Sequence, residues 1–178
     1  MIASVRPGTL VCMNTAFADF VRDAEATIDD PEAIAARLQP LLAQEGWLAR
    51  RHQAPGVDRY RQHLLHVSSC RRLSVVALVW RPGQVTPIHD HVSWCVVGVY
   101  RGLERENRYR LVDGALELTA TIDAEPGHVE ALIPPAENIH SVQAGGDGLT
   151  ISIHVYGADI ERLGSSVYRI YDELALAG

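Results

Sequence analysis

Two closely spaced histidines and a third farther along the chain form the strongest chemical signal in the sequence. His89 and His91 are two positions apart, with Asp90 between them, in the run TPIHDH, residues 86–91. On an extended chain alternate side chains share a face, so both imidazoles can reach one metal ion. His140 follows a pair of prolines, where a later strand can bring a third imidazole to the same place. Three imidazoles suit Fe(II), Zn or Cu rather than Mg or Ca, and they leave the open coordination positions that an enzyme needs.

A second pattern lies in the run TISIHVY, residues 150–156, where polar and apolar side chains alternate. Ser152, His154 and Tyr156 then share one face of a strand. If that face points into a barrel, a hydroxyl, an imidazole and a phenol lie beside the metal, and the three groups can satisfy one another's hydrogen bonds. The alternative is an antiparallel strand with its polar face in water.

These side chains must be positioned by a mainly β domain with helices at its N-terminal end. Helical spacing of apolar residues and the helix start at Asp30-Pro31 predict helices within about residues 14–48. Short β-rich segments then follow between Gly and Pro turns, as in a sandwich or barrel. The segments are 60–67, 72–81, 85–89, 94–101, 104–111, 115–122, 128–133 and 149–156. A short helix or turn and a closing strand are expected over residues 159–172, so that the barrel covers about 60–172 of a single domain, 1–178.

Composition limits the classes of partner and compartment. A chain of 178 residues fits one domain with a buried core. The net charge of -6 argues against nucleic acid and against an anionic membrane surface as partners. Neither a membrane span nor a signal peptide is evident, and the cysteines, at Cys12, Cys70 and Cys95, are scattered. We therefore expect a cytoplasmic protein in a reducing compartment, as a monomer or homodimer.

The spacing of Gly83, His89, His91 and Cys95 resembles the first cupin motif, and a looser second motif ends at His140. Cys95 stands where many cupins carry a ligand glutamate, which leaves a neutral site of three histidines and should place the thiol near it. The alternative for Cys95 is a small buried apolar residue. The resemblance implies a cupin-type β-barrel, or jelly roll.

The HDH run, the later IH pair and the SIHVY strand together resemble the cysteine dioxygenase family of thiol dioxygenases, over roughly residues 58–160. The resemblance implies that His89, His91 and His140 hold Fe(II). It also implies that Ser152, His154 and Tyr156 form the family's hydrogen-bonded triad beside the iron. A site of this kind oxidises a small thiol with O2 to its sulfinic acid.

The substrate-binding residues follow from the same resemblance. Gln62 stands two residues after Tyr60, the pattern of bacterial 3-mercaptopropionate dioxygenases, which the chain resembles more closely than the mammalian type. Those enzymes also use an arginine shortly after the SIHVY strand. The nearest candidate for binding the substrate carboxylate is Arg162, although the position in register is Ser165.

Cys95 points toward the mammalian type instead, in which a cysteine near this position is crosslinked to the triad tyrosine. Its spacing to His91 is one residue short of that pattern. A partial or absent thioether between Cys95 and Tyr156 is therefore expected.

Several functions remain open at this level. The favoured one is a non-haem Fe(II) dioxygenase that converts 3-mercaptopropionate or cysteine to its sulfinic acid. The alternatives are a cysteine dioxygenase proper and a non-catalytic cupin that binds a metal or ligand. A zinc-dependent isomerase or hydrolase is disfavoured, because the motif contains no spare carboxylate to act as general base. The simplest alternative is that the histidines are ordinary surface or core residues.

Overall fold

A computed structural model describes residues 14–134 and 138–171. The helices are α1 (Thr15–Ala26), α2 (Pro31–Leu42), the 3-10 helix η1 (Arg50–Gln53) and α3 (Ile160–Leu163). The strands are β1 (Arg61–Val67), β2 (Ser74–Trp80), β3 (His89–His91), β4 (Cys95–Arg101), β5 (Leu103–Val112), β6 (Ala115–Ala124), β7 (Val129–Leu132), β8 (Ile139–Gly145), β9 (Thr150–Tyr156) and β10 (Val167–Ile170). The expected mainly β architecture with N-terminal helices is confirmed.

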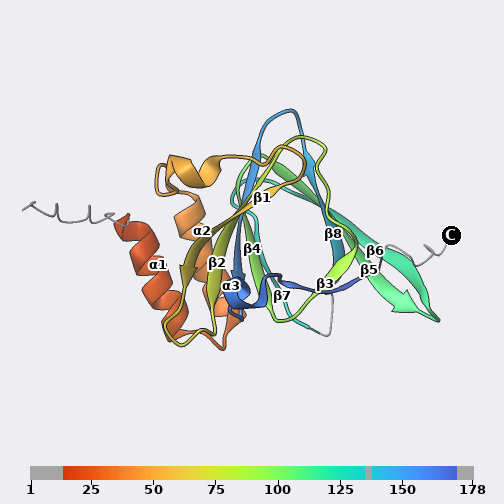
Figure 1. The fold of residues 1–178 in the computed structure, drawn as a ribbon, viewed down its shortest axis with the longest axis horizontal. Helices are drawn as coiled ribbons and strands as arrows, with labels where there is room; N and C mark the ends of the chain where they lie inside the picture. The colour runs from red at the N-terminus through yellow and green to blue at the C-terminus, as the bar shows by residue number, and fades with distance from the viewer. Residues whose placement is uncertain (1–13, 135–137, 172–178) are drawn as a thin grey trace, which may run out of the picture.

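The strands form two five-stranded antiparallel sheets that face each other (Figure 1). The strand order is β1-β2-β9-β4-β7 in the first sheet and β10-β3-β8-β5-β6 in the second. The helices α1 and α2 cover the outer face of the first sheet, at the left of Figure 1. The space between the sheets is therefore the only part of this arrangement, among the described residues, in which polar side chains from both sheets can meet.

Side-chain alternation divides the first sheet between two cores. On β2 every residue is buried, because one face packs against the helices and the other faces the second sheet. Ile151, Ile153 and Val155 of β9 join the helix-side core. Their neighbours Ser152 and His154 are buried on the opposite face. The alternation of the SIHVY run thus turns its polar groups toward the barrel interior.

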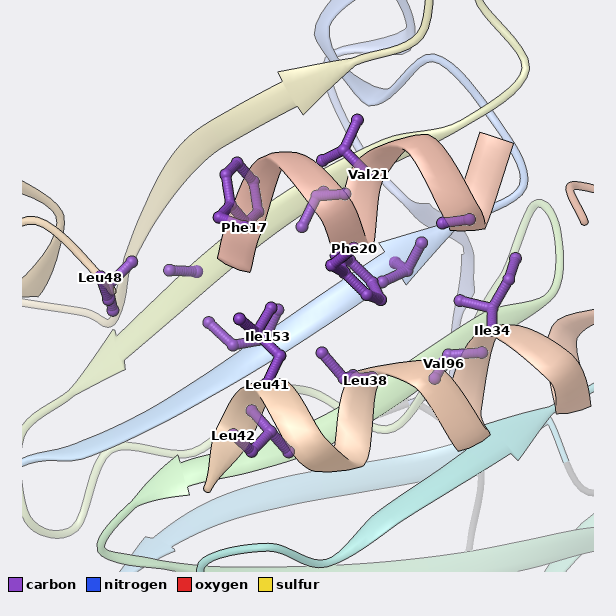
Figure 2. Close-up of a cluster of buried hydrophobic side chains, with 14 of the residues drawn as sticks. Phe17, Phe20, Val21, Ile34, Leu38, Leu41, Leu42, Leu48, Val96 and Ile153 are labelled. Carbon is purple, nitrogen blue, oxygen red and sulfur yellow. The ribbon is translucent and has the colours of Figure 1, made fainter. Parts of the chain in front are cut away.

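The helices begin where the sequence supplies caps. The Asp30 side chain accepts a hydrogen bond from the Ala33 amide, and Pro31 occupies the first turn, where its missing N–H costs nothing. Apolar residues of both helices then meet the sheet in one cluster (Figure 2). The labelled members are Phe17, Phe20, Val21, Ile34, Leu38, Leu41, Leu42, Leu48, Val96 and Ile153.

Two strand positions differ from the expectation. The segment 85–89 is mostly loop, and β3 begins only at His89, because Pro87 has no N–H for a ladder and Val85 makes a single isolated bridge. The strand β8 is the later strand expected to carry His140, for which the sequence supplied no bounds. It lies between β3 and β5, and this pairing outweighs the weak β propensity of residues such as Ala144.

No helix within residues 14–134 and 138–171 is long and apolar enough to cross a membrane. The cytoplasmic location and the single-domain organisation stay predictions.

Candidate metal centre

The three histidines meet inside the barrel, on two strands that pair in the second sheet. His89 and His140 are direct partners in the β3·β8 register, and His91 shares the face of His89. The ring centroids lie 4.7 Å apart for His89 and His140, 4.9 Å for His91 and His140, and 5.0 Å for His89 and His91. All three side chains are buried, and one ring nitrogen from each lies within 4.8 Å of the others.

Hydrogen bonds around the cluster orient each ring. Each uses Nδ1: His89 toward the Pro87 carbonyl at 2.9 Å, His91 toward Asn138 Oδ1 at 3.2 Å, and His140 toward Glu106 Oε1 at 2.5 Å. These acceptors place the ring proton on Nδ1 and the lone pair on Nε2. The Nε2 atom of His140 is buried and has no hydrogen-bond partner among residues 14–134 and 138–171. A buried polar atom without a partner is costly, so this donor set fits a metal ion.

The electrostatics keep the imidazole of His91 neutral, as a ligand must be. Burial, followed by the nearby His140, His89 and His154, lowers the pKa of His91 to about 2. A neutral ring offers its lone pair at any ordinary pH. The cluster can therefore bind a cation without first losing protons to solvent at His91.

One carboxylate, that of Glu106, lies directly behind His140 and adds a negative charge next to the histidine cluster. Burial opposes ionisation of Glu106, but hydrogen bonding and charge from His140, with hydrogen bonds from Glu130 and Arg108, lower its pKa to about 2. Arg108 bonds to Glu106 at 2.9 Å and also to Glu130 of the facing sheet. A carboxylate behind a ligand histidine makes that histidine a stronger donor. The strand β5 thus supplies a carboxylate directly behind one histidine of the cluster.

Next to the cluster, the polar face of β9 forms a continuous hydrogen-bonded line. Ser152 Oγ lies 2.9 Å from His154 Nε2, and the Tyr156 hydroxyl lies 3.3 Å from His154 Nδ1. Trp80 Nε1 donates to Ser152 Oγ at 3.3 Å. The ring centroids of Tyr156 and His91 lie 5.8 Å apart. The phenol end of the line is therefore next to the histidine cluster. Burial, with smaller effects of His140 and His89, lowers the pKa of His154 to about 3, so this ring is neutral as well.

Cys95 lies at the same end of the line. Its Sγ is 3.8 Å from His154 Nδ1, the atom that also faces the Tyr156 hydroxyl. Burial raises the pKa of the Cys95 thiol well above its usual range. The side chain is therefore a neutral, fully buried thiol beside the phenol.

The two expected substrate-binding residues lie elsewhere. Gln62 pairs with Leu78 in the β1·β2 register, so it shares the face of Leu78, which lines the barrel. Its side chain is exposed, at the rim next to Tyr60, whose ring packs 4.3 Å from that of Trp80. Arg162 is exposed on α3, and within the described residues its hydrogen bond is from the backbone to Asp159. The structure therefore brings Gln62 to the barrel side but does not bring Arg162 into contact with the cluster.

Sequence reasoning missed three polar residues of the interior: Asn138, Glu106 and Glu104. Asn138 stands two residues before His140, and the two glutamates are themselves two residues apart, the same alternation that marks the histidine pair. That spacing was the available signal. The barrel does contain carboxylates, supplied by β5 and not by the motif, so the argument against a general base holds only for the motif itself.

Outside the barrel, Asp90 ties the ligand strand to the closing strand. Its carboxylate accepts hydrogen bonds from the Arg169 amide at 2.7 Å and the Tyr171 hydroxyl at 2.8 Å. The Tyr171 amide donates to the Ile88 carbonyl at 2.8 Å. The strand β3, which has three residues, is thereby held by β10 on one edge and β8 on the other.

Comparison with known proteins supports the fold. No known protein-family model matches the sequence. Recombinant oxalate oxidase in complex with glycolate is similar with a TM-score of 0.50 and 14% identity, over 66% of this chain and 62% of that chain. An RmlC-like cupin protein from Desulfovibrio desulfuricans gives a TM-score of 0.44 and 22% identity, over 64% and 96% of the two chains. At 14% identity the likeness to oxalate oxidase shows the fold alone, and with the two facing antiparallel sheets it confirms the expected mainly β, cupin-type barrel.

Proposed function

We propose that this protein is a non-haem Fe(II)-dependent thiol dioxygenase that converts a small thiol carboxylic acid, 3-mercaptopropionate or cysteine, to its sulfinic acid. The observation that carries the proposal is the meeting of two sets of residues. A cluster of three buried histidines lies directly beside the Ser152–His154–Tyr156 line. A metal-binding role alone explains the histidines but gives no reason for a buried phenol and imidazole next to them.

In the proposed reaction, His89, His91 and His140 hold the iron through Nε2. A ferrous ion bound there would lower the pKa of the thiol and activate O2, so that RSH + O2 gives RSO2H with both oxygen atoms on sulfur. Because the ligands are neutral, the site favours an anionic thiolate. A site that bound both substrates would make the oxidation effectively intramolecular.

Tyr156 and His154 position the phenol proton beside the substrates. The phenol is buried, and burial raises its pKa well above the usual range, so Tyr156 keeps its proton. His154 holds the hydroxyl from one side at 3.3 Å. We assign Tyr156 the role of hydrogen-bond donor to the substrates, with His154 and Ser152 orienting it.

Gln62, with Arg162 as the expected cationic partner, is assigned to the substrate carboxylate. The two assignments are separable, because Gln62 lies on the barrel side of β1 and Arg162 on the exposed α3. Q62A and R162A should each be compared with the unaltered protein. The variant whose KM for 3-mercaptopropionate rises, with kcat little changed, identifies the contact.

The direct test is anaerobic loading with Fe(II), followed by O2 uptake with 3-mercaptopropionate, cysteine and mercaptosuccinate. We expect equal molar consumption of O2 and one thiol, and formation of the sulfinic acid detected by mass spectrometry. A variant with His140→Ala should bind less iron and consume no O2. Uptake with none of the thiols by iron-loaded protein would instead favour a non-catalytic cupin that binds a metal or ligand.

A cysteine dioxygenase proper is the second candidate, and Cys95 favours it because its thiol lies next to Tyr156. The ratio of kcat/KM for cysteine and 3-mercaptopropionate separates the two. The cytoplasmic location and the monomeric or homodimeric state remain part of this proposal, as do the absence of nucleic-acid and membrane partners.

A further inference from the structure

A buried glutamate with no part in the proposed reaction lies at the far end of the Ser152–His154–Tyr156 line. Glu104 is on β5, only 3% of its side chain is exposed, and its Oε1 has no hydrogen-bond partner among the described residues. Its strand partners on β6 and β8 are Ala124 and Ala144, which carry no charge. An acid in such surroundings needs an explanation.

The polar neighbours of Glu104 connect it to the line. Burial raises the pKa of Glu104 to about 7, and the Ser152 hydroxyl lowers it by hydrogen bonding. Glu106 raises this pKa through its charge, and the Trp80 indole lowers it. Glu104 is therefore a buried neighbour of the Ser152 hydroxyl, whose hydrogen bonds in the structure are those with His154 and Trp80.

The hydroxyl of Ser152 can transmit the state of Glu104. It has one proton and two lone pairs, and one lone pair is taken by Trp80 Nε1. When Glu104 is ionised, Ser152 must donate to it and accept from His154 Nε2–H. When Glu104 is protonated, it donates to Ser152, and Ser152 donates to His154 Nε2.

The tautomer of the neutral His154 ring then determines the direction of its hydrogen bond with the Tyr156 hydroxyl. With the proton on Nε2, His154 Nδ1 is an acceptor, and the Tyr156 hydroxyl donates to it. With the proton on Nδ1, His154 donates to the phenol oxygen. The Tyr156 proton is then free to point toward the three-histidine cluster.

We propose that Glu104 sets the tautomer of His154 through Ser152. The tautomer then decides whether the Tyr156 hydroxyl donates its hydrogen bond to His154 Nδ1 or points its proton toward the three-histidine cluster. Glu104 is a positioning residue in this scheme. The charged or titratable groups that interact with it are Glu106 on its own strand and Cys95 on β4 of the facing sheet. Only the catalytic consequence rests on the proposed function, since the tautomer is a property of the protein without metal or thiol.

The experiment uses metal-free protein labelled with 15N-histidine. Two-dimensional NMR that connects the ring nitrogens to the ring carbon-bound protons distinguishes the tautomers, and the H154Q variant identifies the His154 signals. In unaltered protein, we expect the proton to be on Nδ1 at low pH and on Nε2 at high pH, in a single transition near neutrality. A control variant, Glu125→Gln at an exposed turn, should show the same transition.

The variants E104Q and S152A decide the matter independently. E104Q cannot ionise, and S152A breaks the connection, so in both the His154 tautomer should no longer change with pH. A tautomer that stays constant in the unaltered protein, or a transition that persists in E104Q, would overturn the proposal. Lack of O2 uptake by iron-loaded protein would contradict the proposed function and leave this result standing.

Discussion

Cys95 and Tyr156 lie directly opposite each other on the neighbouring strands β4 and β9. Directly opposed side chains share a sheet face with Cβ atoms about 4.5–5.5 Å apart. Both side chains approach His154 Nδ1. The thiol is therefore held beside the phenol by strand register.

This register predicts a partial thioether between Cys95 and Tyr156 after turnover. One C–S bond would replace one S–H and one aromatic C–H bond, with O2 accepting two electrons and two protons. Intact-mass spectrometry of protein incubated with Fe(II), thiol and O2 should show a fraction lighter by two hydrogen atoms. The Cys95→Ala variant should show no such fraction, and a mass unchanged in the unaltered protein would contradict the prediction.

Replacing Glu106 with glutamine should weaken metal binding while leaving all three ligands in place. The variant loses the charge that bonds to His140 Nδ1 at 2.5 Å. Removing such a partner typically lowers metal affinity about 10–100-fold. Fe(II) titration under anaerobic conditions measures the change, with Glu117→Gln on the outer strand β6 as control. Equal affinities in the two variants would show that the carboxylate does not act on the metal site.

Glu104 should make the folded state less stable as pH rises. Its pKa is raised from 4.5 to about 7 in the folded protein, so the folded state keeps a proton that the unfolded state releases. The loss of stability begins near pH 4.5 and is complete above about pH 7. From pH 5 to pH 8, the free energy of unfolding of E104Q should rise relative to unaltered protein by on the order of 2 kcal/mol. Urea titrations at both pH values measure this, and a constant difference would argue that Glu104 is ionised throughout.

Gly98 should be required for the contact between α2 and β4. A Cβ atom at this position would lie 2.6 Å from Leu42 Cδ1 and 2.9 Å from Leu38 Cδ2. Gly98→Ala should therefore lower the free energy of unfolding by about 1–3 kcal/mol, as overpacking does. Gly148→Ala, where nothing lies within 4 Å, is the matched control. Equal thermal stability of the two variants would mean that α2 shifts without cost.

The sequence was most informative where chemistry follows strand alternation. The HDH run and the SIHVY run each place their polar side chains on one face, and the structure buries both faces in the barrel. Local spacing is sufficient here, because residues two apart on a strand share a face whatever the strand pairs with.

The rest depended on pairings between distant strands. Glu104 and Glu106 alternate as the histidines do. Only the β5·β8 register shows that they lie on the face of the sheet that carries His140, and not on the solvent face. A strand at His140 was expected, but the bounds of β8 were not, because its own residues predict strand weakly and its neighbours β3 and β5 determine its form. The position of Arg162 was likewise beyond sequence spacing, because it depends on the direction in which α3 leaves β9.

The link through Asp90 makes the end of the described chain part of the metal site's support. The residue between two ligand histidines uses its carboxylate to anchor the amide of Arg169 and the hydroxyl of Tyr171. Metal binding by the histidines should therefore slow amide exchange along β10, on the outside of the barrel. A ligand that separated β10 from β3 would weaken metal binding without entering the barrel interior.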